Sequence, residues 1–363
     1  MEIRSVTLFC EADRVPAVYA PFLTAARGAF PVRVQSTRLG TTPFPDWLPR
    51  EDAAAGASAV VEAWQAAGAD YVSLGPVQLR HDPAWLAVIP DLLMAAEGIF
   101  ASIEIATTDG RIDTGRCHAA AEVIRRVSAL RPDGFANLFL GALAACGPGH
   151  PFLPASYAGG GADSFAIAVE AADVALEAIA GAATLAEAAN RLTAGIEAAA
   201  ATVVPVAQRL SAEFRLNFGG LDFSLAPYPT PDKSLGAALE ALGTRVGAPG
   251  ALFAAAFITA AIDRAAFPRT GFSGLMLPVL EDATLARRAA AGELALNDLL
   301  LYSAVCGVGL DTIPLPGDVD EATLTGIYDF AKPTLASIRG YCIGGGVNVA
   351  MACDIRLASA DSV

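Results

Sequence analysis

Short apolar runs alternate with alanine-rich segments through the first 330 residues, and glycine or proline stands at most of the joins. A short apolar run bounded by such turn residues is typical of a β-strand. Strands that alternate with helices indicate an α/β fold. We therefore expect strands in SVTLFC, VRVQSTRL, DYVSLGP and GIFASIEIA, and helices near 51–67, 83–96 and 116–130.

The clearest helical pattern follows the sequence YAGGGAD. Apolar residues there recur at alternating steps of four and three positions, which predicts a helix with one buried face. These residues are Phe165, Val169, Ala172, Leu176 and Ile179. A second helix is expected to begin at Thr184, because Glu187 three positions later completes a capping box, and Pro205 should bend or end it.

Composition and charge narrow the class of protein. Hydrophobic residues make up 54% and charged residues 17% of the chain, and much of the apolar excess is alanine. The longest uncharged helical stretch, GALFAAAFITAAI, is shorter than the ~20 residues that cross a bilayer, so we expect no membrane partner. A net charge of −14 opposes binding to phosphate backbones, so no nucleic acid partner is expected.

The amino terminus and the cysteines indicate the cell compartment. The sequence MEIRSVTLFC begins directly with a strand pattern and has none of the features of a signal peptide. The six cysteines form no C-x-x-C pair, as is typical of buried thiols in a reducing compartment. We therefore predict a cytoplasmic protein.

Several stretches of the body resemble one family. They are VRVQSTRLGTTPFPDWL, DGFANLFLGALAACGPGHPFLPASYAGGGADSFAIAVEAADVAL, GLDFSLAPYPTP, GFSGLMLPVLED and CGVGLDTIPLPGD. In this order they resemble the uncharacterised family called domain of unknown function 711 over nearly all of residues 1–330. The resemblance implies an α/β barrel related to the pyruvate formate-lyase-like fold of glycyl radical enzymes. It implies no established activity, so function has to be argued from the sites.

Two similar motifs carry the strongest chemical signal. GLDFSLAP and GLDTIPLP place Asp222 and Asp311 at equivalent points of two similar units, as after an internal duplication. If both carboxylates face one cavity of the barrel, they can bind a divalent cation, or one of them can hold a raised pKa and move a proton. Alternatively, each accepts backbone N–H bonds within its own turn. Asp318 has the same two interpretations, and Ser224 and Cys306 lie near these motifs.

Two loops are candidates for ligand binding. Gly159, Gly160 and Gly161 let the backbone approach a ligand, and the amides of the expected helix would attract an anion there. The alternative is a plain connection. In CGPGHPFLP, His150 lies close enough to Cys146 for a thiolate and a base, but no third orienting residue follows from the sequence. The spacing of the histidines and cysteines fits no zinc site, and Glu281 and Asp282 are typical of a helix start.

Residues 331–363 resemble a different family. Their sequence, beginning KPTLASIRGYCIGGG, is similar to the oxyanion segment of the crotonases, the enoyl-CoA hydratase family, in which Gly345 would supply one oxyanion amide. Asn348 stands where the hydratases have a catalytic glutamate, so the active site is incomplete. We interpret 1–330 as the barrel-like body and 331–363 as a crotonase-like fragment that is not an independent domain. Lys332 to Tyr341 are expected to form a strand at the barrel edge.

The sequence thus predicts an enzyme or binder for a small anionic metabolite in a central barrel cavity. A non-enzymatic ligand sensor with the same cavity is the first alternative. A crotonase-type acyl-CoA hydratase or isomerase is the second, and it is disfavoured because the fragment lacks the glutamate. Substrate, reaction type, metal and cofactor remain unknown, and the sequence leaves a homo-oligomer open.

Overall fold

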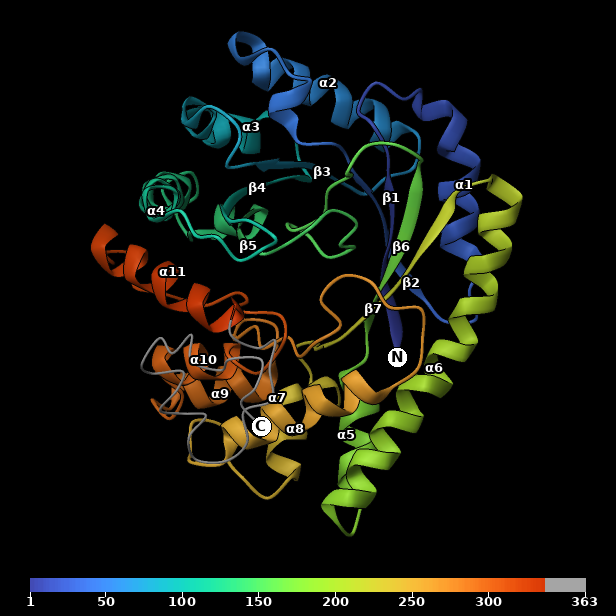
Figure 1. Cartoon of the computed structure of the whole chain (residues 1–363), viewed down its shortest axis with the longest axis vertical. Helices are drawn as coiled ribbons and strands as arrows, with labels where there is room; N and C mark the ends of the chain where they lie inside the picture. Colours follow the sequence, from blue (N-terminus) through green and yellow to red (C-terminus); the bar gives the residue numbers. More distant parts are fainter. Residues whose placement is uncertain (337–363) are drawn as a thin grey trace.

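The computed structural model describes the backbone of residues 1–336 and the side chains of residues 1–328. Seven strands form one sheet in the order β5-β4-β3-β2-β1-β6-β7. The sheet curls into a half-barrel, with helices outside it and loops on its concave side (Figure 1). The predicted α/β class is confirmed. In the described part of the chain, the predicted barrel is a half-barrel.

The strands are mostly parallel. Their bounds are β1 Glu2–Phe9, β2 Val34–Gly40, β3 Tyr71–Val77, β4 Ile99–Ala106, β5 Leu140–Ala144, β6 Ser164–Glu170 and β7 Asn217–Ala226. Neighbours from β1 to β5 are parallel, β6 is antiparallel to β1, and β7 is parallel to β6. The four strands predicted from the first hundred residues are confirmed as β1 to β4.

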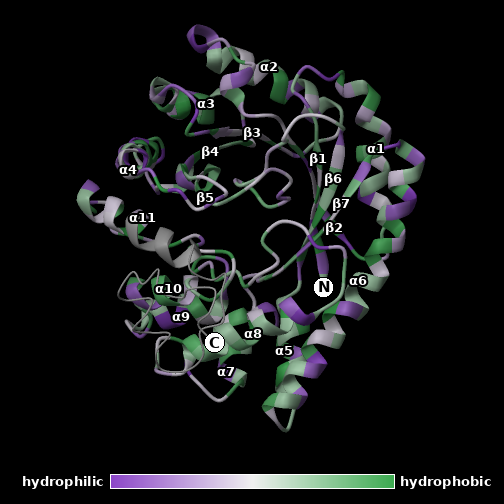
Figure 2. Cartoon of the chain, viewed as in Figure 1, coloured by the Kyte–Doolittle hydropathy of each residue, from purple (hydrophilic) through white to green (hydrophobic). Residues whose placement is uncertain are grey.

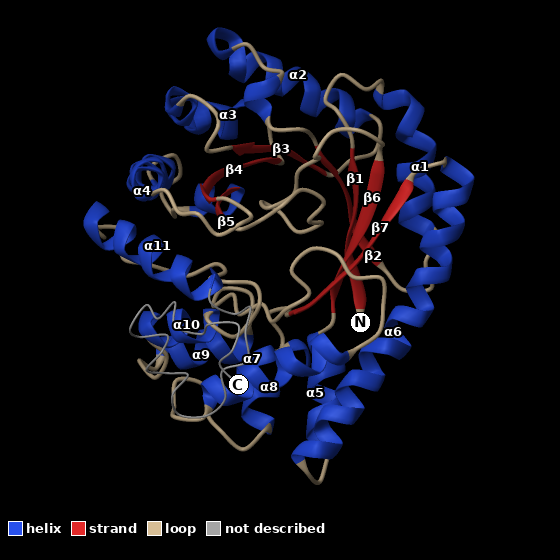
Figure 3. Cartoon of the chain, viewed as in Figure 1, coloured by secondary structure: helices blue, strands red, loops and turns tan. Residues whose placement is uncertain are grey.

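Helices connect the strands (Figure 3). Their bounds are α1 Pro16–Gly28, α2 Ala53–Ala66, α3 Ile89–Ala95, α4 Thr114–Ser128, α5 Ala172–Ala180, α6 Leu185–Phe214, α7 Leu235–Ala241, α8 Ala251–Arg264, α9 Ala283–Ala290, α10 Leu296–Ser303 and α11 Glu321–Ala336. The three helices expected before residue 131 are confirmed, and the second begins with a 3₁₀ turn at Pro83–Val88. Among the described residues, no helix is long and apolar enough to span a membrane.

The prediction of a helix over residues 165–179 is wrong for the first half of this segment. Ser164–Glu170 is strand β6, and only from Ala172 does the chain become helix α5. β6 lies between β1 and β7 and is buried nearly throughout. Strands buried on both faces are apolar at consecutive positions, so a helical spacing can be picked out of them.

Two further expectations concern α6 and the segment from Lys332. The amide of Glu187 donates to Thr184 Oγ1 at 3.1 Å, so α6 is capped as expected, and it does not end at Pro205 but continues to Phe214. Buried side chains on both sides of that proline, including Val203 and Leu210, hold the helix in place. The strand expected from Lys332 is also wrong, because α11 continues to Ala336; the rest of that segment lies outside the described residues.

The convex face of the sheet carries the main hydrophobic core. Leu8 and Phe165 lie on this face, and the ring of Phe22 from α1 packs 5.0 Å from that of Phe165. Trp64 of α2 is also fully buried in the core. The helices around the sheet carry hydrophobic and hydrophilic residues side by side, as their amphipathic role requires (Figure 2).

Candidate functional site

The concave face of the sheet is unusually polar for a buried surface. Residues paired directly across neighbouring strands point to the same face. One row runs from Asp222 through Ala168 and Ser5 to Ser36, and the next pairs Thr7 with Arg38. The buried polar residues of this face are Ser5, Thr7, Ser36, Arg38, Ser73, Ser102, Glu104, Asp222 and Ser224. We call this set the polar face.

Residues 145–158 cover part of this face, and we call them the first covering segment. The hydroxyls of Ser5 and Thr7 both donate to the carbonyl oxygen of Pro151, each at 3.1 Å. A Cβ atom at Gly141 of β5 would lie 2.5 Å from Pro154 Cγ, so the segment sits directly on the sheet there. Small apolar clusters, separate from the main core, lie between this segment and the sheet.

Asp222 anchors a second covering segment, residues 268–276. Its carboxylate accepts the amides of Phe272 and Ser273, each at 2.8 Å, and also the hydroxyl of Ser224. Gly271 has a φ of +61°, and a Cβ there would lie 2.0 Å from Asp222 Oδ2. Burial raises the pKa of Asp222 to about 6, and these donors oppose that rise. The carboxylate thus holds a distant loop, rather than its own turn, and its oxygens are already occupied.

Asp311 lies in a different polar cluster. It is half-buried in a segment without regular structure, and Oδ1 accepts the amide of Thr312 at 2.8 Å. Burial and then the charge of Glu281 raise its pKa to about 6, while Arg4 lowers it. The charged residue that acts on Asp222 is instead Arg269. The two GLD motifs therefore differ in backbone structure, and within residues 1–328 their carboxylates share no hydrogen-bond partner.

Neither Cys306 nor Asp318 makes a hydrogen bond to Asp222 within residues 1–328. The Cys306 thiol is buried and accepts the amide of Gly309 at 3.2 Å, and burial raises its pKa. Its carbonyl oxygen accepts the amide of Leu275 at 2.7 Å, so this residue ties down the second covering segment. Asp318 is exposed in the turn that precedes α11.

His150 lies in the first covering segment, and its ring contacts Phe272 of the second covering segment. Its Nδ1 atom is buried and makes no hydrogen bond within the described residues, and its ring packs edge-on, 4.5 Å from that of Phe272. Burial lowers the pKa of His150 to about 4, so the imidazole is neutral near pH 7. Burial also raises the pKa of the Cys146 thiol to about 12. These two residues do not form a thiolate and base pair.

The three glycines do not precede a helix. Gly160 and Gly161 are exposed, with φ values of +83° and +88°, and the chain passes from them into strand β6. A Cβ at Gly159 would lie 2.9 Å from Pro148 Cγ, so this glycine is needed for close packing. No helix begins directly after these glycines, because the segment that follows them is strand β6. The helix dipole that was expected to attract an anion at this point is therefore absent. Gly345 lies outside the described residues.

The sequence analysis predicts only two of the nine residues of the polar face, and Arg38, Ser73 and Ser102 are among the seven that it does not predict. The Arg38 side chain is buried, its Nε donates to Ser36 Oγ at 2.9 Å, and its guanidinium carbon lies 5.7 Å from the centre of the Tyr71 ring. Burial lowers its pKa to about 9. The hydroxyls of Ser73 and Ser102 are buried without a hydrogen bond in residues 1–328. A signal existed in VRVQSTRL, where four consecutive polar residues interrupt an otherwise buried strand.

A cluster of charges lies at the beginning of β1 and the end of β6. The Glu170 side chain is buried and binds Lys233 at 3.0 Å, Gln35 at 2.7 Å and, more weakly, Arg4 at 3.7 Å. A pocket of about 230 Å³ opens beside it, lined by Glu2, Arg33, Gln35, Tyr228 and Lys233. Within the described part, Glu170 has its charge compensated, whereas Arg38 has no carboxylate within 4.0 Å.

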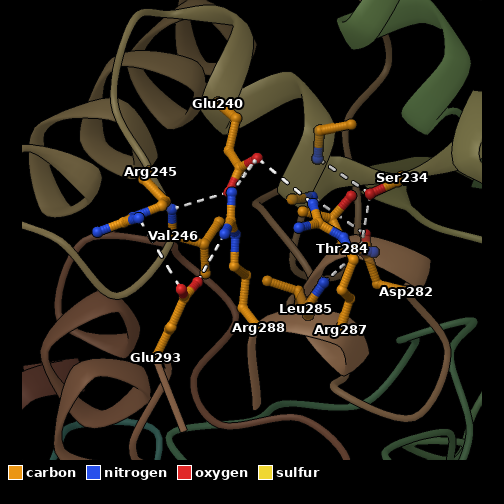
Figure 4. Close-up of polar contacts among 12 residues, drawn as sticks. Ser234, Glu240, Arg245, Val246, Asp282, Thr284, Leu285, Arg287, Arg288 and Glu293 are labelled. Atoms are coloured by element: carbon orange, nitrogen blue, oxygen red, sulfur yellow. Dashed lines mark hydrogen bonds and ion pairs between the residues drawn. The ribbon is translucent and has the colours of Figure 1, made fainter. Parts of the chain in front are cut away.

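Asp282 fixes the end of the loop that continues from the second covering segment (Figure 4). It is fully buried and caps α9 through the amides of Thr284 and Leu285, as its place at a helix start predicts. It also accepts the hydroxyl of Ser234 at 2.7 Å and the amide of Gly236 at 3.1 Å. Nearby, Arg288 of α9 binds Glu240 of α7 through two hydrogen bonds of 2.7 and 3.0 Å.

Comparison with known proteins gives relatives along most of the chain. A UPF0210 protein of Desulforudis audaxviator is 30% identical over 269 residues, and one of Actinobacillus pleuropneumoniae is 30% identical over 255; each alignment covers 68% of this chain. A UPF0210 protein of Pyrobaculum arsenaticum is 41% identical over 127 residues, which is 34% of this chain. The chain spans 57%, 56% and 28% of the lengths of these relatives, respectively.

Two family models match different parts of the sequence. The model described as Enoyl-CoA hydratase/isomerase matches residues 315–363, so this similarity begins before residue 331 and includes all of α11. The model described as Uncharacterised ACR (DUF711) matches residues 21–332. The chain therefore belongs to the DUF711 (UPF0210) family, whose members in this comparison carry no described activity.

Proposed function

We propose that the polar face binds a small anionic metabolite and that Arg38 pairs with its negative charge. The observation that carries the proposal is that this guanidinium, on a buried side chain, has no carboxylate within 4.0 Å among residues 1–328; Asp70 and Glu281 act on it only from farther away. A buried charge without a partner is costly, and an arginine presents a fork of donors that matches a carboxylate or a phosphate. An anion bound there would recover part of that cost.

The neighbouring hydroxyls supply the polar contacts that a small ligand needs. Thr7 is paired directly with Arg38 across β1 and β2, and the unpartnered hydroxyls of Ser73 and Ser102 lie on the same face. Because these hydroxyls are buried, a ligand reaches them only if the first covering segment shifts. That segment is held near this point by two hydroxyl contacts to Pro151, which are individually weak.

Two classes of function are compatible with such a site. In an enzyme, His150 is a candidate to exchange a proton with the ligand, because its Nδ1 atom has no other partner in the described residues. In a non-enzymatic sensor, the same site binds its ligand without turnover. A crotonase-type hydratase is disfavoured, because Asn348 replaces the catalytic glutamate.

Binding of small anions to the full chain tests the proposal. Succinate, acetate and inorganic phosphate are titrated calorimetrically into the wild type and into Arg38→Gln. Loss of a buried charge pair costs about 2–5 kcal/mol, so the affinity for the best anion should fall about 30-fold or more. Arg209→Gln is the matched control, since this exposed arginine of α6 has no ion pair in the described part. Equal affinity in all three proteins would refute the role of Arg38.

His150→Gln separates the two classes. If the protein is an enzyme, this variant should keep anion affinity and lose turnover of the ligand found above. A sensor shows no turnover in either protein.

We also propose a location, a fold relationship and a set of partners for this protein. Cys10, Cys146 and Cys306 are buried free thiols, which fits the cytoplasmic location that we infer. We also infer that the half-barrel is related to the pyruvate formate-lyase-like fold. We infer that the partners of the protein include neither nucleic acid nor membrane, and that the chain is compatible with a homo-oligomer.

A further inference from the structure

We propose that His118, Glu122 and Glu321 form a binding site for a divalent transition-metal ion that joins α11 to α4. Each residue offers one ligand atom, and these atoms all lie within 4.8 Å of one another. His118 and Glu122 are one turn apart on α4, and Glu321 is the first residue of α11. Within the described residues, the ion pairs of these three side chains include no residue of the polar face. The site does not depend on the proposed function.

The spacing of the three ligand atoms matches what one ion requires. His118 Nε2 lies 3.0 Å from Glu321 Oε1 and 3.8 Å from Glu122 Oε1. Zinc binds nitrogen and oxygen at about 2.0–2.2 Å, so tetrahedral ligands lie roughly 3.4 Å apart. The two observed distances lie on either side of that value. Small rotations of these side chains would therefore bring all three atoms to an ion.

The two helices are held together without the metal. Leu324 of α11 is buried, and Tyr328 one turn later packs against the core. Asp320 caps the start of α11 by accepting the amide of Thr323 at 2.7 Å. Because apolar contacts and a cap fix the position of Glu321, the ligands are presented in advance of binding, which favours affinity. Figure 1 shows α11 beside α4.

The ligand set indicates the class of ion. One imidazole and two carboxylates favour zinc, cobalt or manganese over calcium and magnesium, which prefer oxygen ligands alone. Three protein ligands leave a fourth position for water. No C-x-x-C or H-x-x-x-H spacing signals the site, because its third ligand comes from a helix 199 positions after Glu122 in the sequence.

Metal binding to the full chain tests this inference. The protein is stripped with a chelator, and zinc or cobalt is titrated at pH 7.5 while heat and the visible cobalt spectrum are recorded. We expect one ion per chain, a tetrahedral cobalt spectrum and a higher melting temperature. His118→Gln and Glu321→Gln should each weaken binding at least about ten-fold, because even loss of an outer-shell partner has effects of that size.

A matched control separates the site from surface charge in general. Glu213→Gln removes an exposed helical carboxylate that has no partner in the described residues, and it should bind metal like the wild type. All three changes are at the surface, so the chelator-treated variants should melt within about 1–2 °C of the wild type. Binding that survives in both His118→Gln and Glu321→Gln, or no zinc binding at all, would overturn the inference.

Discussion

Replacing Asp282 with alanine should destabilise the protein far more than the loss of an ordinary helix cap. The Asp282 carboxylate is fully buried and receives four hydrogen bonds of 2.7 to 3.1 Å. Two of them cap α9, and two come from Ser234 and Gly236 at the start of α7 (Figure 4). The side chain therefore joins two helices that are nearly fifty residues apart in sequence.

The size of the effect follows from these contacts. Loss of the cap costs about 1 kcal/mol. The Gly236 amide and the Ser234 hydroxyl then remain buried with a lost acceptor, at about 1–3 kcal/mol each. The sum is about 5 kcal/mol. At roughly 2 °C per kcal/mol for a chain of this size, the melting temperature should fall by about 10 °C.

The assay is thermal unfolding followed by circular dichroism, with Asp113→Ala as the matched control. Asp113 is also a helix cap, but it is exposed and accepts only the Arg116 amide, at 2.8 Å. Its loss should cost about 1 kcal/mol, or about 2 °C. If both variants melt at the same temperature, Asp282 acts only as a cap and the reasoning about α7 is wrong.

Three further predictions concern the covering segments and the clusters around them. Gly271→Ala should lower the stability of the protein more than Gly292→Ala. Both glycines have a positive φ, but only at Gly271 would the new Cβ meet a neighbour, Asp222 Oδ2 at 2.0 Å. Equal midpoints of unfolding in urea for the two variants would contradict this. Because the pKa of Asp311 is raised to about 6 in the folded protein, its contribution to stability is present below about pH 4 and is lost as the pH rises through 6. The melting temperature of the wild type minus that of Asp311→Asn should therefore fall between pH 4 and 7, and a constant difference would contradict the assignment. The Cys146 thiol, whose pKa is raised to about 12, should react with an aromatic disulfide only after unfolding, and fast reaction of the native protein at this residue would show that it is accessible.

Much of the fold can be predicted from the sequence, because local patterns determine it. The first four strands and the three helices expected before residue 131 are where the pattern places them, whereas α1 Pro16–Gly28 was not predicted. The prediction fails at β6, which is central and buried on both faces, so its apolar residues follow one another without alternation. Pairing with β1 and β7 decides that this segment is a strand, and such pairing is not a local property.

The candidate site is harder to predict, because it depends on register. Asp222 and Ser224 were found from their motif, and both lie on the polar face. Arg38 and Ser73 share that face with them only because the pairing of β1, β2 and β3 turns those positions inward. A shift of one residue in any of these strands would turn the same side chains toward the helices. No motif in the sequence contains that information.

The two GLD motifs show how local similarity can mislead, and also where the sequence held the answer. After Asp222 the chain reads FSLA, which can donate every backbone amide to a sheet, and it forms the end of β7. After Asp311 it reads TIPLP, in which Pro314 and Pro316 have no amide to donate, and proline is confined to strand edges and bulges. That segment cannot be a central strand and is irregular in the structure. Two identical short motifs therefore imply the same position in the fold only when the residues after each motif can adopt the same backbone conformation.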